Sequence, residues 1–191
     1  NVFLKREKWG LAAGGGSSAG DLPNSATRKS HLSGEYSFGP AGETNGRLVL
    51  QGYLLTKDAE IPASPFSSPG SQSDQRYILN LSGKSQTAKN LWEYRVFTQS
   101  WDNRYKDDFS DDRHRVEGRG AELSVRQEEG RHILLAGLSL AHDSFDSTKS
   151  GQNSRSYGGV FFQDLWALRR DLALLSGLRW DTSSDYGAAP S

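Results

Sequence analysis

The sequence predicts an all-β chain, an antiparallel transmembrane β-barrel segment of about nine strands. Segments of about ten residues alternate between apolar and polar side chains with a period of two. The polar connections between them alternate between long and short, as in barrels with tight turns at one rim and long loops at the other. Aromatic residues fall at both ends of the apolar stretches, where amphipathic rings sit at membrane–water interfaces.

The connections predict which rim each strand end reaches. Long polar breaks are expected at 13–27, 56–75, 102–113, 143–156 and from 182 onward. Short breaks are expected at 39–45, 86–90, 127–131 and 169–171. A soluble sandwich has no reason to place all its long loops at one end, so the pattern favours a barrel.

Alternation assigns a face to each strand, because successive side chains point to opposite sides. In the strands near 26–38, 47–54, 75–83 and 91–99, the predicted outward residues are Leu32, Gly34, Tyr36, Phe38, Leu48, Leu50, Gly52, Leu54, Tyr77, Leu79, Leu81, Gly83, Trp92, Tyr94 and Val96. The predicted inward residues between them include Lys29, His31, Glu35, Arg47, Arg76, Asn80, Glu93 and Arg95. This is the apolar-out, polar-in pattern of a membrane barrel.

The later strands continue the pattern with two exceptions. Near 114–126, 132–140 and 172–181, the predicted outward residues are Ala121, Leu123, Val125, Leu134, Ala136, Leu138, Leu140, Leu172, Leu174, Leu178 and Trp180. The first strand carries four consecutive charged positions, 5–8, so at least one charge would face outward. The eighth, near 157–168, has apolar residues on both faces, and alternation leaves its register open. A soluble β-sandwich is the alternative, and it would bury Leu48, Leu79, Leu138 and Leu178 between two sheets.

Composition removes several classes of protein. The 191 residues are 35% hydrophobic and carry no net charge, and no apolar run approaches the roughly 18 residues of a membrane helix. The basic residues are scattered, which gives no footprint for nucleic acid. Cysteine is absent, which excludes disulfides and thiolate metal sites. The chain starts at Asn1 without a leader and stops just after a strand, so we expect residues 1–191 to be one partial barrel.

A series of short motifs carries a family resemblance over residues 74–187. The series comprises Gln75-Arg76-Tyr77-Ile78-Leu79-Asn80-Leu81, Trp101-Asp102-Asn103-Arg104-Tyr105, Asp111-Asp112-Arg113-His114, Gly120-Ala121-Glu122-Leu123, Asp146-Ser147-Thr148, Phe162-Gln163-Asp164-Leu165-Trp166 and Gly177-Leu178-Arg179-Trp180-Asp181. In order and spacing these motifs resemble the barrel of TonB-dependent outer-membrane receptors, especially the vitamin B12 receptor branch.

The resemblance implies a 22-stranded barrel in the outer membrane of a Gram-negative bacterium, closed by a plug on which the TonB complex pulls. It implies import of a metal chelate, cobalamin-like or a ferric siderophore, by binding and gated transport, and no enzyme activity. This sequence contains neither the plug nor the final strand of that pattern. The alternative is a general porin or a structural or adhesive β-barrel protein, which should lack the ordered motifs.

Two sets of candidate binding residues lie in the expected external loops or near the outer rim. The first set is a candidate calcium site formed by Asp107, Asp108, Asp111 and Asp112, because clustered carboxylates supply the oxygen ligands that Ca²⁺ requires. The resemblance supports this hypothesis, since members of the B12 branch order external loops with calcium. The spacing is not that of an EF-hand, and a solvated acidic loop is the alternative. Phe66, Trp101 and Tyr105 are candidate ligand contacts. The alternative for Phe66 is a loop that merely tolerates proline, and the alternative for Trp101 and Tyr105 is a place in the aromatic girdle. The sequence His142-Asp143-Ser144 cannot form a catalytic relay, because adjacent strand residues point to opposite faces.

Overall fold

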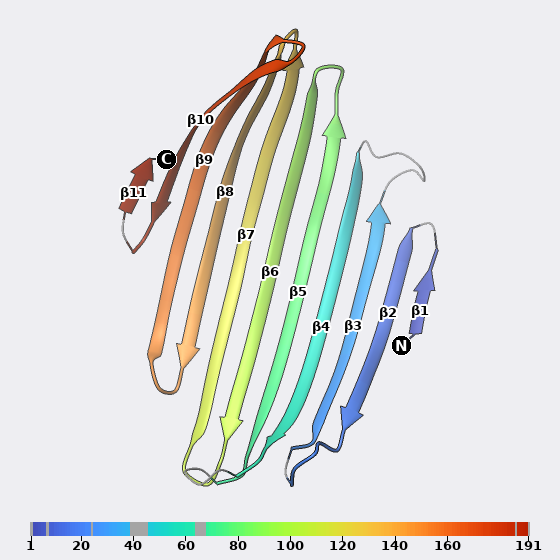
Figure 1. Cartoon of the computed structure of the whole chain (residues 1–191), viewed down its shortest axis with the longest axis vertical. Helices are drawn as coiled ribbons and strands as arrows, with labels where there is room; N and C mark the ends of the chain where they lie inside the picture. The colour runs from blue at the N-terminus through green and yellow to red at the C-terminus, as the bar shows by residue number, and fades with distance from the viewer. Residues whose placement is uncertain are drawn as a thin grey trace.

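The computed structural model describes residues 2–6, 8–23, 25–38, 46–63, 68–185 and 187–190. They form one antiparallel sheet whose eleven strands lie side by side in chain order (Figure 1). The strands are β1 (Val2–Lys5), β2 (Trp9–Ser18), β3 (Thr27–Phe38), β4 (Arg47–Ile61), β5 (Gly70–Gln86), β6 (Asn90–Lys106), β7 (Asp111–Glu129), β8 (His132–Ser147), β9 (Gly151–Arg169), β10 (Leu172–Ser183) and β11 (Gly187–Pro190). Among the described residues β1 and β11 are the two edges, and they do not pair with each other.

The sheet has two ends, which are named here by their connections. The connections that leave β2, β4, β6, β8 and β10 lie at the distal end, and those that leave β1, β3, β5, β7 and β9 lie at the turn end. At the turn end, β7 passes to β8 through the two residues Gly130 and Arg131, where Gly130 has φ +61°. Glycine adopts this left-handed conformation without strain, and it suits a two-residue hairpin.

Pairing confirms the faces that alternation predicts. Leu32, Leu54 and Tyr77 lie directly opposite one another across β3, β4 and β5. Leu123 and Leu138 do so across β7 and β8. The predicted outward residues therefore share one surface, the apolar face, and the residues between them form the polar face.

The predicted long loops are wrong in extent, because the strands continue through most of them. The break expected at 143–156 is paired from His142↔Ser156 to Ser147↔Gly151 and leaves only 148–150 as a turn. The break at 102–113 is likewise paired up to Lys106↔Asp111. Polar side chains are compatible with a strand whose two faces both meet water, since the ladder hydrogen bonds lie in the backbone. The sheet thus extends past the apolar stretches at its distal end.

Three details of the strand assignment are changed. The expected first strand is split in two, because Arg6 and Trp9 exchange backbone hydrogen bonds in a turn between β1 and β2. A short β11 follows β10, so the sheet has eleven strands rather than about nine. The eighth expected strand is β9, and its pairing places Phe162 on the apolar face opposite Ala136, with Phe161 on the polar face opposite Gly137.

This single-layered sheet has no hydrophobic core among its described residues. The buried side chains there are polar: Ser37, Ser100, Asn103, Asp112, Ser147 and Ser183. Leu79, Leu138 and Leu178 are 46%, 39% and 64% exposed, so the soluble sandwich that would bury them is excluded for this structure. No helix among the described residues is long and apolar enough to cross a membrane.

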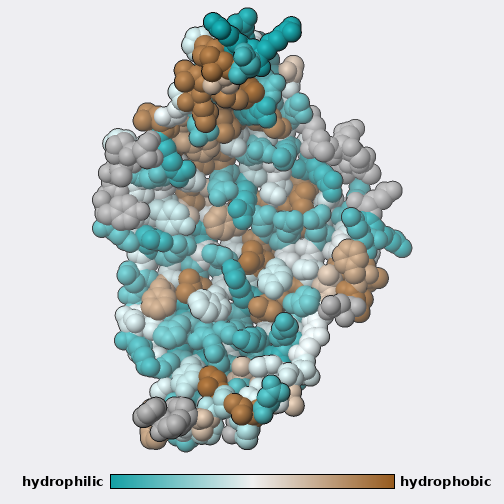
Figure 2. Space-filling view, viewed as in Figure 1, coloured by the Kyte–Doolittle hydropathy of each residue, from teal (hydrophilic) through white to brown (hydrophobic). Residues whose placement is uncertain are grey.

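Each face carries an exception to this sorting at the turn end of β8–β10. On the apolar face, His132 Nδ1 lies 2.9 Å from the Asp164 carboxylate, and its ring stacks on Trp166. On the polar face, Ile133, Leu165 and Leu175 stand in one row. Figure 2 shows a mainly hydrophilic surface over the middle of the sheet, with hydrophobic residues gathered at the top, over this end.

Candidate functional site

The polar face at the distal end carries a hydrogen-bonded group of side chains from β5 to the β8–β9 turn. Asp74 of β5 lies opposite Asn103 of β6. Its carboxylate accepts hydrogen bonds from Asn103 Nδ2 at 2.5 Å and from Trp101 Nε1 at 3.3 Å. Trp101, Asn103 and Tyr105 share this face because they are alternate residues of β6. We call this group, with the residues of the next two paragraphs, the distal cluster: Asp74, Trp101, Asn103, Tyr105, Asp107, Ser110, Asp112 and Lys149.

The turn between β6 and β7 is organised by Asp107. Its carboxylate accepts hydrogen bonds from the Tyr105 hydroxyl at 2.9 Å and from the backbone N–H groups of Phe109 and Ser110 at 2.8 and 2.6 Å. These donors, the Phe109 N–H first, lower the pKa of Asp107 below its ordinary 3.8. The same hydrogen bond raises the pKa of Tyr105 above its ordinary 10.0, because an ionised phenol could no longer donate to the carboxylate.

Asp112 joins this turn to the next one. It is 8% exposed, and its carboxylate lies 2.5 Å from Lys149 Nζ and accepts a hydrogen bond from the Ser110 hydroxyl at 3.0 Å. The hydrogen bond from Lys149 is the main reason that the pKa of Asp112 is lowered. Two adjacent connections at the distal end, 107–110 and 148–150, are therefore held together by one ion pair.

The four candidate calcium ligands do not all point the same way. Asp107 and Asp112 both bond Ser110, whereas Asp111 is on the apolar-face side of β7, where it accepts two hydrogen bonds from Arg104. For Asp108 the contact is a backbone one, from its N–H to the Ser68 hydroxyl at 3.4 Å. Within the described residues, no group of three or more histidine, aspartate or glutamate side chains is arranged to hold a metal ion.

The three candidate ligand contacts, Phe66, Trp101 and Tyr105, are not all placed by the structure. Trp101 and Tyr105 lie on the polar face, so their alternative interpretation as girdle aromatics on the lipid side is wrong. Trp101 is 46% exposed, and its ring has surface to offer a ligand. Phe66 lies outside the described residues.

The sequence was also compared with protein-family models and with curated proteins, and neither comparison gives a match. A solved structure, the siderophore receptor PiuA from Acinetobacter baumannii, is similar over 96% of this chain with a TM-score of 0.71 and 13% sequence identity. The chain has the fold of part of that structure. It spans 40% of that receptor's length, and at this identity the likeness concerns the fold.

The barrel fold identifies the two faces. In a closed membrane barrel the apolar face is the outer one and the polar face lines the lumen, which would put the distal cluster at a mouth of the lumen. Sequence reasoning missed Asp74, Asn103 and Lys149. The first two could have been found by extending the alternation past the apolar stretch, but Lys149 depends on how two turns approach each other.

The hydrogen bonds of Asp107 and Tyr105 are predicted to stabilise the distal cluster only within a limited pH range. Because the folded-state pKa of Asp107 is lowered, its contribution to stability is present above pH 3.8 and is lost as the pH falls through the lower folded value. Because that of Tyr105 is raised, its contribution is present below pH 10.0 and is lost as the pH rises through the higher folded value. Hydrogen exchange, corrected for intrinsic rates, should show the Phe109 and Ser110 amides protected between these limits. Asp107→Asn should give weaker protection at pH 7, and equal protection in both proteins at pH 7 would contradict the assignment.

Proposed function

We propose that this chain is part of the wall of a TonB-dependent outer-membrane receptor that imports a metal chelate, cobalamin-like or a ferric siderophore, by binding and gated transport. The observation that carries the proposal is the sorting of side chains in a sheet with a receptor-barrel fold: exposed leucines on one face and a hydrogen-bonded polar group with an exposed tryptophan on the other.

The sheet supports a position in the outer membrane. A single layer with exposed Leu138, Leu140 and Leu178 and no apolar core among its described residues needs an apolar medium on that side. Hydrocarbon supplies it, and the paired backbone satisfies the polar groups that lipid cannot. The edges at β1 and β11 need further strands, which the remainder of a larger barrel would provide.

The distal cluster supports binding rather than catalysis. Its carboxylates are already engaged by Asn103, Tyr105 and Lys149, which holds the side chains in place without leaving a nucleophile and base in contact. The exposed Trp101 ring can stack on a corrin or on the aromatic groups of a siderophore. Energy coupling would come from the TonB complex acting on a plug, as in the receptor family that the sequence resembles.

The test is chelate binding by the intact receptor. We expect Trp101→Ala to weaken binding of cyanocobalamin or of one ferric siderophore by about tenfold, because losing an aromatic anchor costs about 1–3 kcal/mol. Trp180→Ala, which removes the same ring from the apolar face, is the matched control and should leave the dissociation constant unchanged. Titration of intrinsic fluorescence measures both. Failure of the wild-type receptor to bind any chelate would favour the porin or structural barrel.

We also propose, with Asp107, Asp108, Asp111 and Asp112 as ligands, that calcium orders the external turn. Binding would have to reorient Asp111 away from Arg104. Calorimetric titration of the intact receptor with Ca²⁺ should give a saturable heat that is absent when the four residues are changed to asparagine. Identical heats in the two proteins would exclude these ligands.

A further inference from the structure

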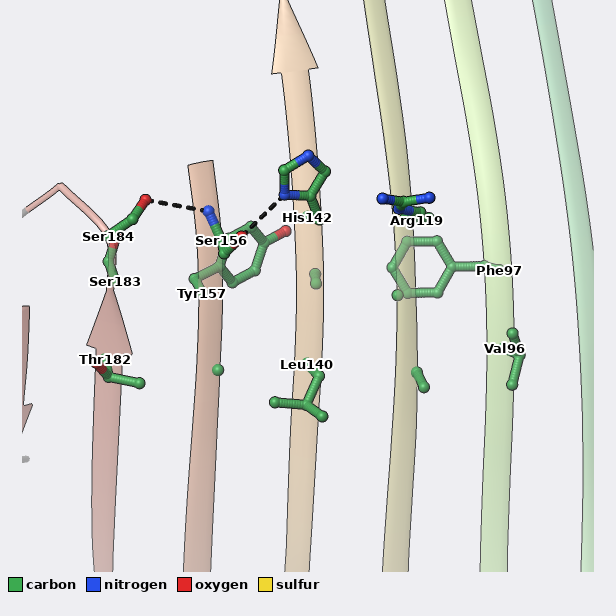
Figure 3. Close-up of a pocket in the computed structure, with 14 residues that line it drawn as sticks. Val96, Phe97, Arg119, Leu140, His142, Ser156, Tyr157, Thr182, Ser183 and Ser184 are labelled. Atoms are coloured by element: carbon green, nitrogen blue, oxygen red, sulfur yellow. Dashed lines mark hydrogen bonds between the residues drawn. The ribbon is translucent and has the colours of Figure 1, made fainter. Parts of the chain in front are cut away.

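A groove of about 750 Å³ crosses the apolar face near the middle of β6–β9 and the distal end of β10 (Figure 3). Two rows of side chains border it, and both belong to the apolar face. The residues between the rows, among them Phe97, Ala141 and Tyr157, turn their side chains to the polar face. The groove therefore opens on the outer side of the barrel wall, away from the distal cluster.

The row nearer the turn end is apolar and uneven. Val96 and Leu140 are 56% and 61% exposed, with the small Ala121 between them. Beside Leu140 comes Gly158, over which the Leu140 side chain leans: a Cβ at that glycine would lie 2.8 Å from Leu140 Cδ2. Small residues between exposed large ones leave the space that an alkyl chain needs.

The row nearer the distal end is polar and cationic. Arg119 and His142 lie directly opposite each other on β7 and β8, and Figure 3 shows them side by side. His142 Nδ1 is 2.9 Å from the Ser156 hydroxyl, which holds the imidazole in place.

Arg119 has no counterion among the residues that the structure describes. Among the described residues it makes no hydrogen bond or ion pair, whereas Arg115, four residues away on the same face, is bound to Glu117 at 2.5 Å. Further toward the distal end, Arg104 and Arg113 are bound to Asp111 and Asp102. The unpaired arginine is thus the cation closest to the apolar row.

We propose that this groove binds a membrane lipid with a phosphate monoester headgroup, the phosphate on Arg119 and His142 and an acyl chain along Val96, Ala121 and Leu140. A guanidinium binds two phosphate oxygens at once, and the phosphate supplies the counterion that Arg119 lacks. The two rows are two residues apart, about 7 Å, which separates a headgroup phosphate from the first part of its acyl chain. The inference rests on the proposed membrane position.

The test uses the intact receptor in phosphatidylcholine nanodiscs that contain a minor fraction of phosphatidic acid, with retained lipid counted by native mass spectrometry. The wild type should retain phosphatidic acid about tenfold over its share of the bilayer, since hydrogen bonds to a charged group contribute about 1.5–3 kcal/mol. Arg119→Gln should abolish this enrichment. Arg115→Gln, an arginine on the same face with its own carboxylate partner, should keep it.

A second variant tests the acyl part of the site without altering charge. Ala121→Leu fills the space between Val96 and Leu140 and should also remove the enrichment, while millimolar inorganic phosphate should not compete in the wild type. Enrichment that survives Arg119→Gln, or that free phosphate abolishes, would overturn the lipid site. A receptor that inserts but shows no enrichment overturns only this inference, whereas one that fails to insert into bilayers overturns the proposed membrane position as well.

Discussion

Replacing Leu138 with arginine is expected to destabilise the intact protein by about 2–4 kcal/mol in a bilayer, the range for an arginine on the lipid face near the midplane of a barrel. Leu138 lies between Leu123 and Val160 on the apolar face, with apolar residues on either side along the strand as well. The free energy of unfolding in phospholipid vesicles, from urea titration, measures the effect.

The adjacent residue provides a matched control. Ser139 lies on the polar face between Glu122 and Gly159, so Ser139→Arg places the same side chain in a hydrated lumen, near a carboxylate. Its unfolding free energy should change by less than about 0.5 kcal/mol. If the two substitutions have equal effects, the apolar face does not meet hydrocarbon.

The second large effect concerns Gly137. A Cβ built there would lie 2.5 Å from Phe161 Cζ and 2.9 Å from the backbone oxygen of Leu123. The ring of Phe161 covers this glycine from the neighbouring strand, and the carbonyl cannot move without disturbing the ladder. Gly137→Ala should therefore cost about 1–3 kcal/mol, the usual range for overpacking, in the same unfolding assay.

Gly16 is the control for this substitution. It also lies in a strand, β2, where nothing stands within 4 Å of a Cβ. Gly16→Ala should be neutral or slightly stabilising, because alanine restricts the unfolded chain more than glycine does. A cost for Gly16→Ala as large as that for Gly137→Ala would show that loss of glycine, not the contact with Phe161, is responsible.

The faces could be predicted from sequence because the apolar residues recur with a period of two and one register error would reverse them all. Leu79 and Leu138 are where the alternation puts them. Alternation could not assign the faces of β9, because Phe161 and Phe162 are neighbours and only the pairing with β8 decides which one faces outward.

The strand lengths could not be predicted in the same way. Beyond the apolar stretch both faces meet water, so residues such as Asp143 and Arg155 lose the alternation on which strand prediction depends. They still pair, because a growing antiparallel ladder needs only backbone groups. The expected loop 102–113 is therefore largely strand, and both aromatic candidates, Trp101 and Tyr105, lie on β6.

In the proposed receptor, the paired strands that continue beyond the apolar stretch would form an ordered rim at the mouth of the barrel. The side chains proposed to contact the ligand lie on strand ladders, and the Asp112–Lys149 ion pair joins neighbouring hairpins. A ligand that binds there would cost the protein little conformational entropy, so even a few contacts would contribute efficiently to affinity. Such a rim would be retuned by exchanging single side chains rather than by lengthening loops.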